Sequence, residues 1–141
     1  MIKVGIIGTG VMGAGHARFI KEHISNAVVT ALSDIDDVRM QSLATEIDTV
    51  QFQTNSAKEL MNSDLVDAVI IASPDPLHVE HLEIAIASKK PTLCEKPIAT
   101  TLEEARQIAI KIKKYESEIS ATRIHFGYII VTGKQIGRAH V

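Results

Sequence analysis

Short apolar runs alternate with helix-like segments along most of the chain. Two of these runs, Ile2–Ile7 and 68–72, are unbroken and rich in β-branched residues, which is typical of strands buried on both faces of a parallel sheet. The run at 50–52 is shorter and alternates with polar neighbours, so it predicts a strand near an edge of the sheet. The predicted strands are Ile2–Ile7, Ala27–Ser33, 50–52, 68–72, 91–95 and 123–131.

Between these runs, apolar residues recur every three or four positions, which predicts amphipathic helices that each bury one face. The polar stretch at 115–120 predicts a loop after the last of them. The predicted buried positions are Ala17, Ile20 and Ile24 in the first helix, Met40, Leu43, Ala44 and Ile47 in the second, Leu60 and Met61 in the third, Val79, Leu82 and Ile86 in the fourth, and Ala105, Ile108, Ala109 and Ile112 in the fifth.

Short motifs predict where several helices begin. Ser56 and Glu59 match a capping box, in which each side chain accepts a hydrogen bond from the backbone N–H of the other residue. Residues 100–104 hold two overlapping boxes of the same kind. Asp75 suits an N-cap, because the proline after it fits the first helical position.

The alternation of strands and helices indicates βαβ units with right-handed crossovers. We therefore expect an α/β fold with a doubly wound parallel sheet, built as one domain over residues 1–132. Residues 133–141 predict an irregular tail. The last six, at 136–141, match what one reading frame of a common sequencing adapter encodes, so we expect an artefactual or truncated end. The alternative is that residues 133–137 form a turn leading into a further domain.

Composition excludes several classes of function. The chain has 141 residues, of which 45% are hydrophobic and 23% charged, as is usual for soluble globular domains. Its net charge of −2 gives no basic surplus for nucleic acid or an anionic membrane, and no apolar run approaches the ~20 residues of a membrane span. The first strand begins at Ile2 and leaves no room for a signal peptide, so we expect a cytoplasmic protein. Cys94, the single cysteine, lies in an apolar stretch and is expected to be an inert packed thiol.

A glycine-rich segment joins the first predicted strand to the first helix and fits the pattern G-x-G-x-x-G. The first glycine permits a tight turn, the second lets a pyrophosphate approach the backbone, and the third lets the helix pack closely on the strand. The free N–H groups and the dipole at the start of the helix then favour phosphate. The segment therefore predicts a dinucleotide site, whose candidate residues are Gly8, Thr9, Gly10, Val11, Met12 and Gly13.

An acidic residue, Asp34, ends the second predicted strand, about 20 residues after the last glycine. A carboxylate there accepts hydrogen bonds from the adenosine ribose hydroxyls of NAD and repels the extra phosphate of NADP. Ile35 follows it, which favours NAD further, although the nearby Arg39 keeps NADP possible. The alternative reading of Asp34 is a cap of the next helix, a role that Asp36 and Asp37 can already serve.

Further polar residues follow the ends of the fourth and fifth predicted strands: Ser73 and Pro74 after the fourth, Glu95 and Lys96 after the fifth. Ligands of open α/β sheets bind at the carboxyl ends of the strands, so we expect these residues to converge with Asp34 and the glycine loop. Lys96 precedes a proline, which holds its backbone extended. Its amine can bind a substrate hydroxyl or transfer a proton, whereas a surface lysine at a strand end is an equally weighted alternative.

The glycine loop at 8–13, Asp34, the segment SPDPLH at 73–78 and CEKP at 94–97 fall in a fixed order along the chain. Together they resemble the N-terminal half of the glucose–fructose oxidoreductase and inositol dehydrogenase family (Gfo/Idh/MocA), over residues 1–112. The resemblance implies a Rossmann domain that binds NAD or NADP. It also implies hydride transfer between that cofactor and a hydroxyl-bearing carbon of a sugar, inositol or related polyol.

The same resemblance implies roles for single residues. Lys96 would be the active-site lysine and would contact the cofactor, Glu95 would help to set the loop beside the cofactor, and Pro97 would follow a cis peptide bond. The pair at 73–74 and His78 would line the cofactor near its nicotinamide half.

The chain also departs from the family pattern, because the second domain that supplies substrate contacts is missing. We expect the cofactor-binding half of a homo-oligomeric oxidoreductase, with little or no turnover by itself. The alternative is a stand-alone dinucleotide sensor, in which Lys96 has no catalytic role. His78 and His81 lie one turn apart with no third ligand nearby, so we expect no metal site, a helix-cap or cofactor-facing His78 and an exposed His81.

Overall fold

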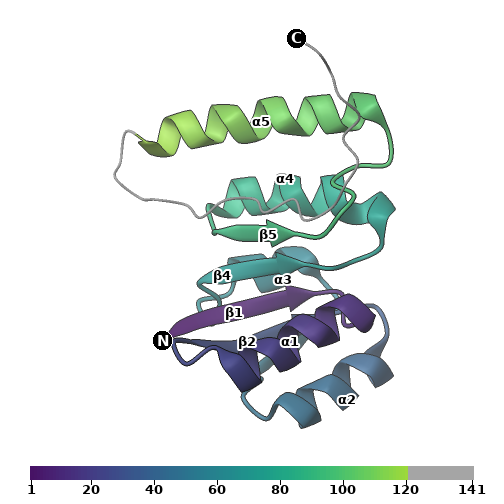
Figure 1. The fold of residues 1–141 in the computed structure, drawn as a ribbon, viewed down its shortest axis with the longest axis vertical. Coiled ribbons are helices and arrows are strands. Elements are labelled where there is room, and N and C mark those ends of the chain that lie inside the picture. The colour runs from purple at the N-terminus through teal and green to yellow at the C-terminus, as the bar shows by residue number, and fades with distance from the viewer. Residues whose placement is uncertain (121–141) are drawn as a thin grey trace.

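The computed structural model describes residues 1–120, with only the helical backbone described for 116–120. A five-stranded sheet runs through it in the order β3-β2-β1-β4-β5 (Figure 1). The elements are β1 Ile2–Ile7, α1 Val11–His23, β2 Ala27–Ser33, α2 Asp37–Ile47, β3 Phe52–Thr54, α3 Ala57–Asn62, β4 Ala68–Ile71, the 3-10 helix η1 Asp75–Leu77, α4 His78–Ser88, β5 Thr92–Cys94 and α5 Leu102–Ser120.

All neighbouring strands are parallel, and their register aligns the carboxyl ends at one edge of the sheet. Ile7 at the end of β1 pairs with both Ser33 of β2 and Ile71 of β4, and Ile71 pairs with Cys94 of β5. After β1 the chain forms β2 and β3 on one side of β1. It later returns and forms β4 and β5 on the other side. This change of direction creates the switch point at which open α/β sheets bind ligands.

Helices cover both faces of the sheet. Successive strand residues point to opposite faces, so Ile6 packs among the residues of α1 and α2, whereas Ile7 packs with α3, α4 and α5. In β2, Leu32 likewise packs with the residues of α1 and α2, and Ala31 packs with those of α3, α4 and α5. Burial of one such isoleucine or leucine side chain contributes about 1.5–3 kcal/mol relative to its exposure. In Figure 1, α5 lies on the far side of α4 from the glycine loop.

The sequence predicted the five strands and the helices between them close to their observed positions. The loop predicted at 115–120 is wrong, because α5 continues to Ser120. That stretch has neither glycine nor proline, and its glutamates are good helix formers, so its polarity did not indicate a break. The strand predicted at 123–131, the domain boundary at 132 and the tail at 133–141 lie outside the described residues. None of the helices within residues 1–120 is long and apolar enough to cross a bilayer.

Two of the predicted helix starts are confirmed. Asp36 is the N-cap of α2, and its carboxylate accepts a hydrogen bond from the backbone N–H of Arg39 at 3.0 Å. At the start of α5, Thr101 and Glu104 form a complete capping box, with the Glu104 N–H donating to the Thr101 hydroxyl and the Thr101 N–H to the Glu104 carboxylate. The hydroxyl of Thr100, which begins the other predicted box, donates to Glu104 at 2.9 Å.

Other predicted caps are wrong in part. Ser56 accepts from the Glu59 N–H as predicted, but the Glu59 carboxylate accepts from the hydroxyl of Thr54 in place of the Ser56 backbone. Asp75 makes no capping hydrogen bond, because the chain first forms the short helix η1 and α4 begins only at His78. The helix that was predicted to begin after Asp75 therefore begins later in the chain, at His78.

Two glycines of α1 provide a matched test of how closely this helix packs on β1. A Cβ at Gly13 would lie 1.8 Å from the carbonyl oxygen of Gly8, so Gly13→Ala forces a backbone shift that we expect to cost about 1–3 kcal/mol or more. A Cβ at Gly15 meets nothing within 4 Å, so Gly15→Ala is expected to stabilise the helix by about 0.5–1 kcal/mol. Urea unfolding measures both changes, and equal free energies of unfolding would contradict the close contact.

Candidate functional site

A hollow of about 780 Å³ opens where the carboxyl ends of β1, β2 and β4 meet. The glycine loop, the start of α2 and the loop after β4 form its walls, as the sequence predicted for a ligand site at this edge. The predicted site residues that line it are Gly8, Gly10, Val11, Met12, Asp34, Ser73 and Pro74. The predicted site residues that do not line it are Thr9, Gly13, His78, Glu95 and Lys96.

The glycine loop is held too tightly for side chains at two of its three glycines. Gly8 has a φ of +90°, and a Cβ there would lie 2.5 Å from the carbonyl oxygen of Ala72. Gly13 is pressed against the Gly8 carbonyl, as described above. Gly10 differs, because the only atom near its missing Cβ is a guanidinium nitrogen of Arg39 at 3.7 Å. The backbone at Gly10 is therefore open to the hollow, as close approach of a phosphate requires.

Within residues 1–120, the start of α1 faces the hollow without a capping hydrogen bond from a side chain. Its N-cap, Gly10, makes no side-chain capping bond, and the first turn contains no acidic residue. Val11 and Met12 line the hollow with exposed side chains. The first N–H groups of a helix carry a partial positive charge, so this end of α1 suits an anion.

Asp34 is fixed by hydrogen bonds from two directions. Its Oδ2 accepts from the backbone N–H of Thr9 at 2.6 Å and from the Thr9 hydroxyl at 2.7 Å, and its Oδ1 accepts from the backbone N–H of Asp36 at 3.0 Å. Burial alone would raise the pKa of Asp34, but these hydrogen bonds and the charge of Arg39 lower the pKa below its usual value. Asp34 is therefore ionised at neutral pH. Thr9, which belongs to the glycine loop, is buried and holds this carboxylate in place.

The acceptor capacity of Asp34 is not exhausted by these contacts. A carboxylate offers about four lone-pair sites, and three donors occupy this one. One further hydroxyl can therefore bind at Oδ1, and a second can displace the rotatable hydroxyl of Thr9. Arg39 lies at the same wall of the hollow, where its guanidinium is paired with Asp36 at 2.9 Å.

Lys96 lies outside the hollow and its side chain is exposed. The residue before it, Glu95, is largely buried and accepts a hydrogen bond from His16 Nε2 at 2.7 Å. The peptide bond between Lys96 and Pro97 is cis, as the family resemblance implied. Sequence reasoning missed His16, which follows Gly13 by three residues and therefore lies one turn further along the same face of α1.

The two histidines of α4 are both buried, which corrects the prediction of an exposed His81. The ring of His81 forms a 2.8 Å hydrogen bond between Nδ1 and the hydroxyl of Ser73. Burial lowers the pKa of His81, so this ring is neutral at pH 7. His78 does not reach the hollow, because its ring lies between the carbonyl oxygens of Ser73 and Pro97.

Cys94 at the end of β5 is an inert thiol, as the sequence predicted. Burial raises the pKa of Cys94 to about 12, and the neighbouring charge of Glu95 adds to this effect. A thiol in that state is protonated at neutral pH and is neither a nucleophile nor a metal ligand. Over the part of the chain that the structure describes, no three His, Cys, Asp or Glu side chains converge as metal ligands would.

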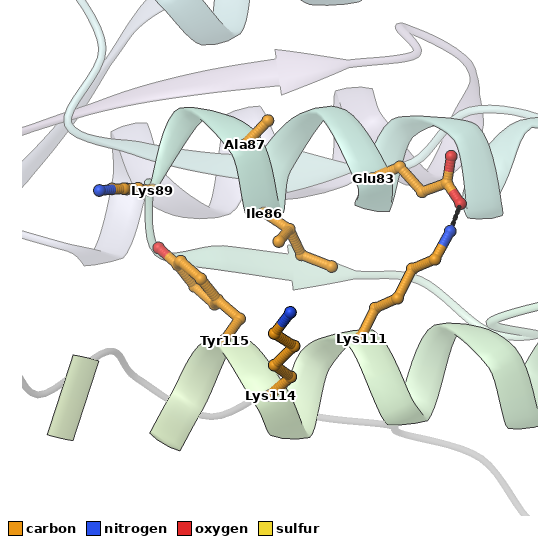
Figure 2. A pocket seen from close by; sticks show the side chains of 7 residues that line it. All are labelled: Glu83, Ile86, Ala87, Lys89, Lys111, Lys114 and Tyr115. Carbon is orange, nitrogen blue, oxygen red and sulfur yellow. Dashed lines mark hydrogen bonds and ion pairs between the residues drawn. The ribbon is translucent and has the colours of Figure 1, made fainter. Parts of the chain in front are cut away.

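A second hollow, of about 430 Å³, lies between α4 and α5 (Figure 2). In Figure 2 the Nζ of Lys111 in α5 donates a hydrogen bond to the carboxylate of Glu83 in α4. This hollow is remote from the carboxyl ends of the strands and shares no residue with the first one. Its lining residues are Glu83, Ile86, Ala87, Lys89, Lys111, Lys114 and Tyr115.

Known proteins match this chain at both the sequence and the fold level. The inositol 2-dehydrogenase of Agrobacterium fabrum is 39% identical over 109 residues, which are 76% of this chain and 32% of that protein. The enzyme of the same name from Rubrobacter xylanophilus is 34% identical over 128 residues, or 91% of this chain and 35% of that protein. The chain thus spans about a third of the length of the curated relatives it matches.

Solved structures show the same arrangement. The scyllo-inositol dehydrogenase of Lactobacillus casei with bound cofactor NAD(H) and scyllo-inositol superposes with a TM-score of 0.78 at 26% identity, over 83% of this chain and 34% of that one. The myo-inositol dehydrogenase of the same organism, in complex with NAD(H) and myo-inositol, gives a TM-score of 0.76 at 30% identity, over 81% of this chain and 34% of that one.

A family model, GFO_IDH_MocA, described as the oxidoreductase family with an NAD-binding Rossmann fold, matches residues 2–122. That range contains the glycine loop, the switch point of the sheet and every residue of the hollow described above. The chain therefore belongs to the Gfo/Idh/MocA oxidoreductase family, of which it carries the NAD-binding Rossmann domain.

Proposed function

We propose that this chain is the cofactor-binding half of an oxidoreductase that transfers hydride between NAD(H) and a hydroxyl-bearing carbon of a polyol or sugar. One observation carries the proposal: an open helix N-terminus and an ionised carboxylate face the same hollow at the switch point of the sheet. A dinucleotide needs this pair of features, because its anionic pyrophosphate requires hydrogen-bond donors and its neutral ribose diol requires a hydrogen-bond acceptor.

The pyrophosphate is assigned to the start of α1. Gly10 leaves the backbone accessible there, and the N–H groups of the first turn have no acidic competitor. Nearby side chains of Val11 and Met12 provide apolar surface beside these donors. A phosphate oxygen bound at this end gains both hydrogen bonds and the favourable field of the helix dipole.

The adenosine ribose is assigned to Asp34, which favours NAD over NADP. A carboxylate accepts hydrogen bonds from ribose hydroxyls but repels a phosphate at the same position. Arg39 is the nearest cation on this wall, and its pairing with Asp36 offsets its attraction for such a phosphate. Asp34 is thus the specificity residue of the proposed cofactor site.

The nicotinamide half is assigned to the opposite wall, where Ser73 and Pro74 line the hollow. His78 supports this wall from within the fold, because its buried ring lies 2.8 Å from the Ser73 carbonyl oxygen. Glu95 and Lys96 lie beyond the hollow on the loop after β5. We assign proton transfer to or from the substrate hydroxyl to the Lys96 amine, which is exposed and can reach a substrate held by a further domain.

The substrate class rests on the relatives, several of which are named as inositol dehydrogenases. An inositol or sugar presents a secondary hydroxyl whose carbon gives up a hydride and whose oxygen gives up a proton. NAD supplies the hydride acceptor when it is bound, and we assign the role of proton acceptor to the Lys96 amine in its neutral form. The match covers about a third of each relative, and we place the substrate contacts in the regions of such proteins outside the match, so residues 1–141 alone are expected to bind NAD without appreciable turnover.

Replacing Asp34 by arginine tests the cofactor assignment in this chain. We expect Asp34→Arg to raise the Kd for NAD+ by roughly 10- to 100-fold, as loss of charge-assisted hydrogen bonds implies, and to shift the preference towards NADP+. Isothermal titration calorimetry with both cofactors measures the change. The matched control is Glu22→Arg, which makes the same charge change at an exposed carboxylate near the far end of α1. Equal NAD+ affinity in the two variants would contradict the ribose assignment.

Replacing Lys96 by alanine tests the chemical assignment in any form of this protein that oxidises a polyol. We expect Lys96→Ala to lower kcat by about 10²–10⁴ through loss of a positioned acid–base group, with the NAD+ affinity retained. Steady-state polyol oxidation and calorimetry separate the two effects. Undiminished turnover would place the proton transfer elsewhere and favour a domain in which Lys96 has no catalytic role.

A further inference from the structure

Lys96 is exposed, yet the residues on both sides of it are held by buried or half-buried histidines from two different helices. On one side, His16 of α1 contacts the carboxylate of Glu95, with 2.7 Å between Nε2 and Oε1. On the other side, His78 of α4 contacts the carbonyl oxygen of Pro97, with 2.6 Å between Nδ1 and that oxygen. The loop after β5 is therefore held at two points, one on each side of the exposed Lys96.

The Glu95 contact is well shielded from solvent. The side chain of Glu95 is 11% exposed and that of His16 is 28% exposed. Glu95 is also tied to the sheet, because its backbone N–H donates to the carbonyl oxygen of Ile71 at 2.9 Å. A hydrogen bond to a carboxylate in such a setting is stronger than a neutral one, so His16 and the sheet together define where Glu95 lies.

The His78 contact joins two loops at once. Its Nδ1 faces the Pro97 carbonyl, and its Nε2 faces the carbonyl of Ser73 at 2.8 Å. Carbonyl oxygens only accept hydrogen bonds, so a ring nitrogen of His78 that carries a hydrogen donates to the carbonyl it faces. The neighbouring titratable group on the same helix is His81, which interacts electrostatically with His78 and bonds to the Ser73 hydroxyl.

We propose that His16 and His78 are positioning residues that bracket Lys96: each holds, through a ring contact, a residue directly beside the lysine. The catalytic role of Lys96 itself rests on the function proposed above, whereas the bracket is a property of this chain alone. His16 extends from the helix that begins at the glycine loop, and His78 holds the Ser73 wall of the same hollow. The bracket thus fixes the lysine relative to both halves of the cofactor site.

This arrangement has a chemical reason. Proton transfer requires an amine placed within hydrogen-bond distance of the substrate hydroxyl, and a displacement of about 1 Å is costly. A flexible lysine side chain cannot meet that requirement unless its backbone is fixed. Histidine suits the task because one planar ring presents a nitrogen on each of two sides, as the two carbonyls around His78 require.

Amide hydrogen exchange in the full 141-residue chain tests the bracket without any cofactor. We expect His16→Leu and His78→Leu each to speed exchange at Glu95, Lys96 and Ile98 by roughly tenfold or more, the ratio that corresponds to loss of one charge-assisted hydrogen bond. His16→Gln keeps an N–H donor for Glu95 and should restore slow exchange. His23→Leu, at the exposed histidine of the same helix, should leave it unchanged.

The pattern of exchange decides the outcome. Faster exchange confined to the β5 loop, with recovery in His16→Gln, supports the bracket. Unchanged exchange in His16→Leu, or a uniform increase over all strands, would overturn it, because the histidine would then serve general stability only. Calorimetry with NAD+ on the same samples tests the cofactor site separately. Loss of NAD+ binding would count against the proposed function, whereas the exchange rates of the β5 loop decide for or against the bracket.

Nitrogen-15 spectra of the histidine rings in the unmodified chain test the His78 contact directly, even if His78→Leu does not fold. We expect a ring N–H of His78 that exchanges slowly with solvent, because it is held against the carbonyl oxygen of Pro97 or of Ser73. The exposed His23 provides the internal reference and should show no slowly exchanging ring hydrogen. Fast exchange of every ring hydrogen of His78 would contradict its place in the bracket.

Discussion

The close contact between Gly8 and Gly13, the outer glycines of the loop, determines how the loop and α1 are placed at the carboxyl edge of the sheet. With Gly13 against the carbonyl of Gly8, α1 begins directly above the end of β1, and its first N–H groups open onto the hollow. The loop is then short enough for the N–H and hydroxyl of Thr9 to reach Asp34 at the end of β2. One close backbone contact therefore positions both the phosphate site and the ribose site.

The parallel register extends this constraint to the remaining strands. Because Ile7 pairs with both Ser33 and Ile71, the loops that follow β1, β2 and β4 all begin at the same height along the sheet. Polar groups that are far apart in sequence become neighbours, and their charges act on one another. Asp34 illustrates this, since backbone donors from two of these loops outweigh the effect of burial on its pKa.

The sequence predicted the parts of the site that depend on local pattern. Apolar runs located the strands, and the spacing of Gly8, Gly10 and Gly13 located the turn and the start of α1. It did not predict the parts that depend on tertiary neighbours. His78 was expected at the cofactor and is instead buried between two carbonyls, His81 was expected in solvent and is buried against Ser73, and His16 matched no motif. A lone histidine has no periodicity, so only its packed surroundings reveal what it does.

Backbone amide spectra of the nitrogen-15-labelled chain, recorded during titration with NAD+, test the central claim most directly. If the hollow at the carboxyl edge is the cofactor site, the largest shift changes will lie in residues 8–13, at Asp34 and at Ser73. Changes concentrated between α4 and α5, or no changes at saturating NAD+, would contradict the account, because the open start of α1 and the carboxylate of Asp34 would then bind no dinucleotide.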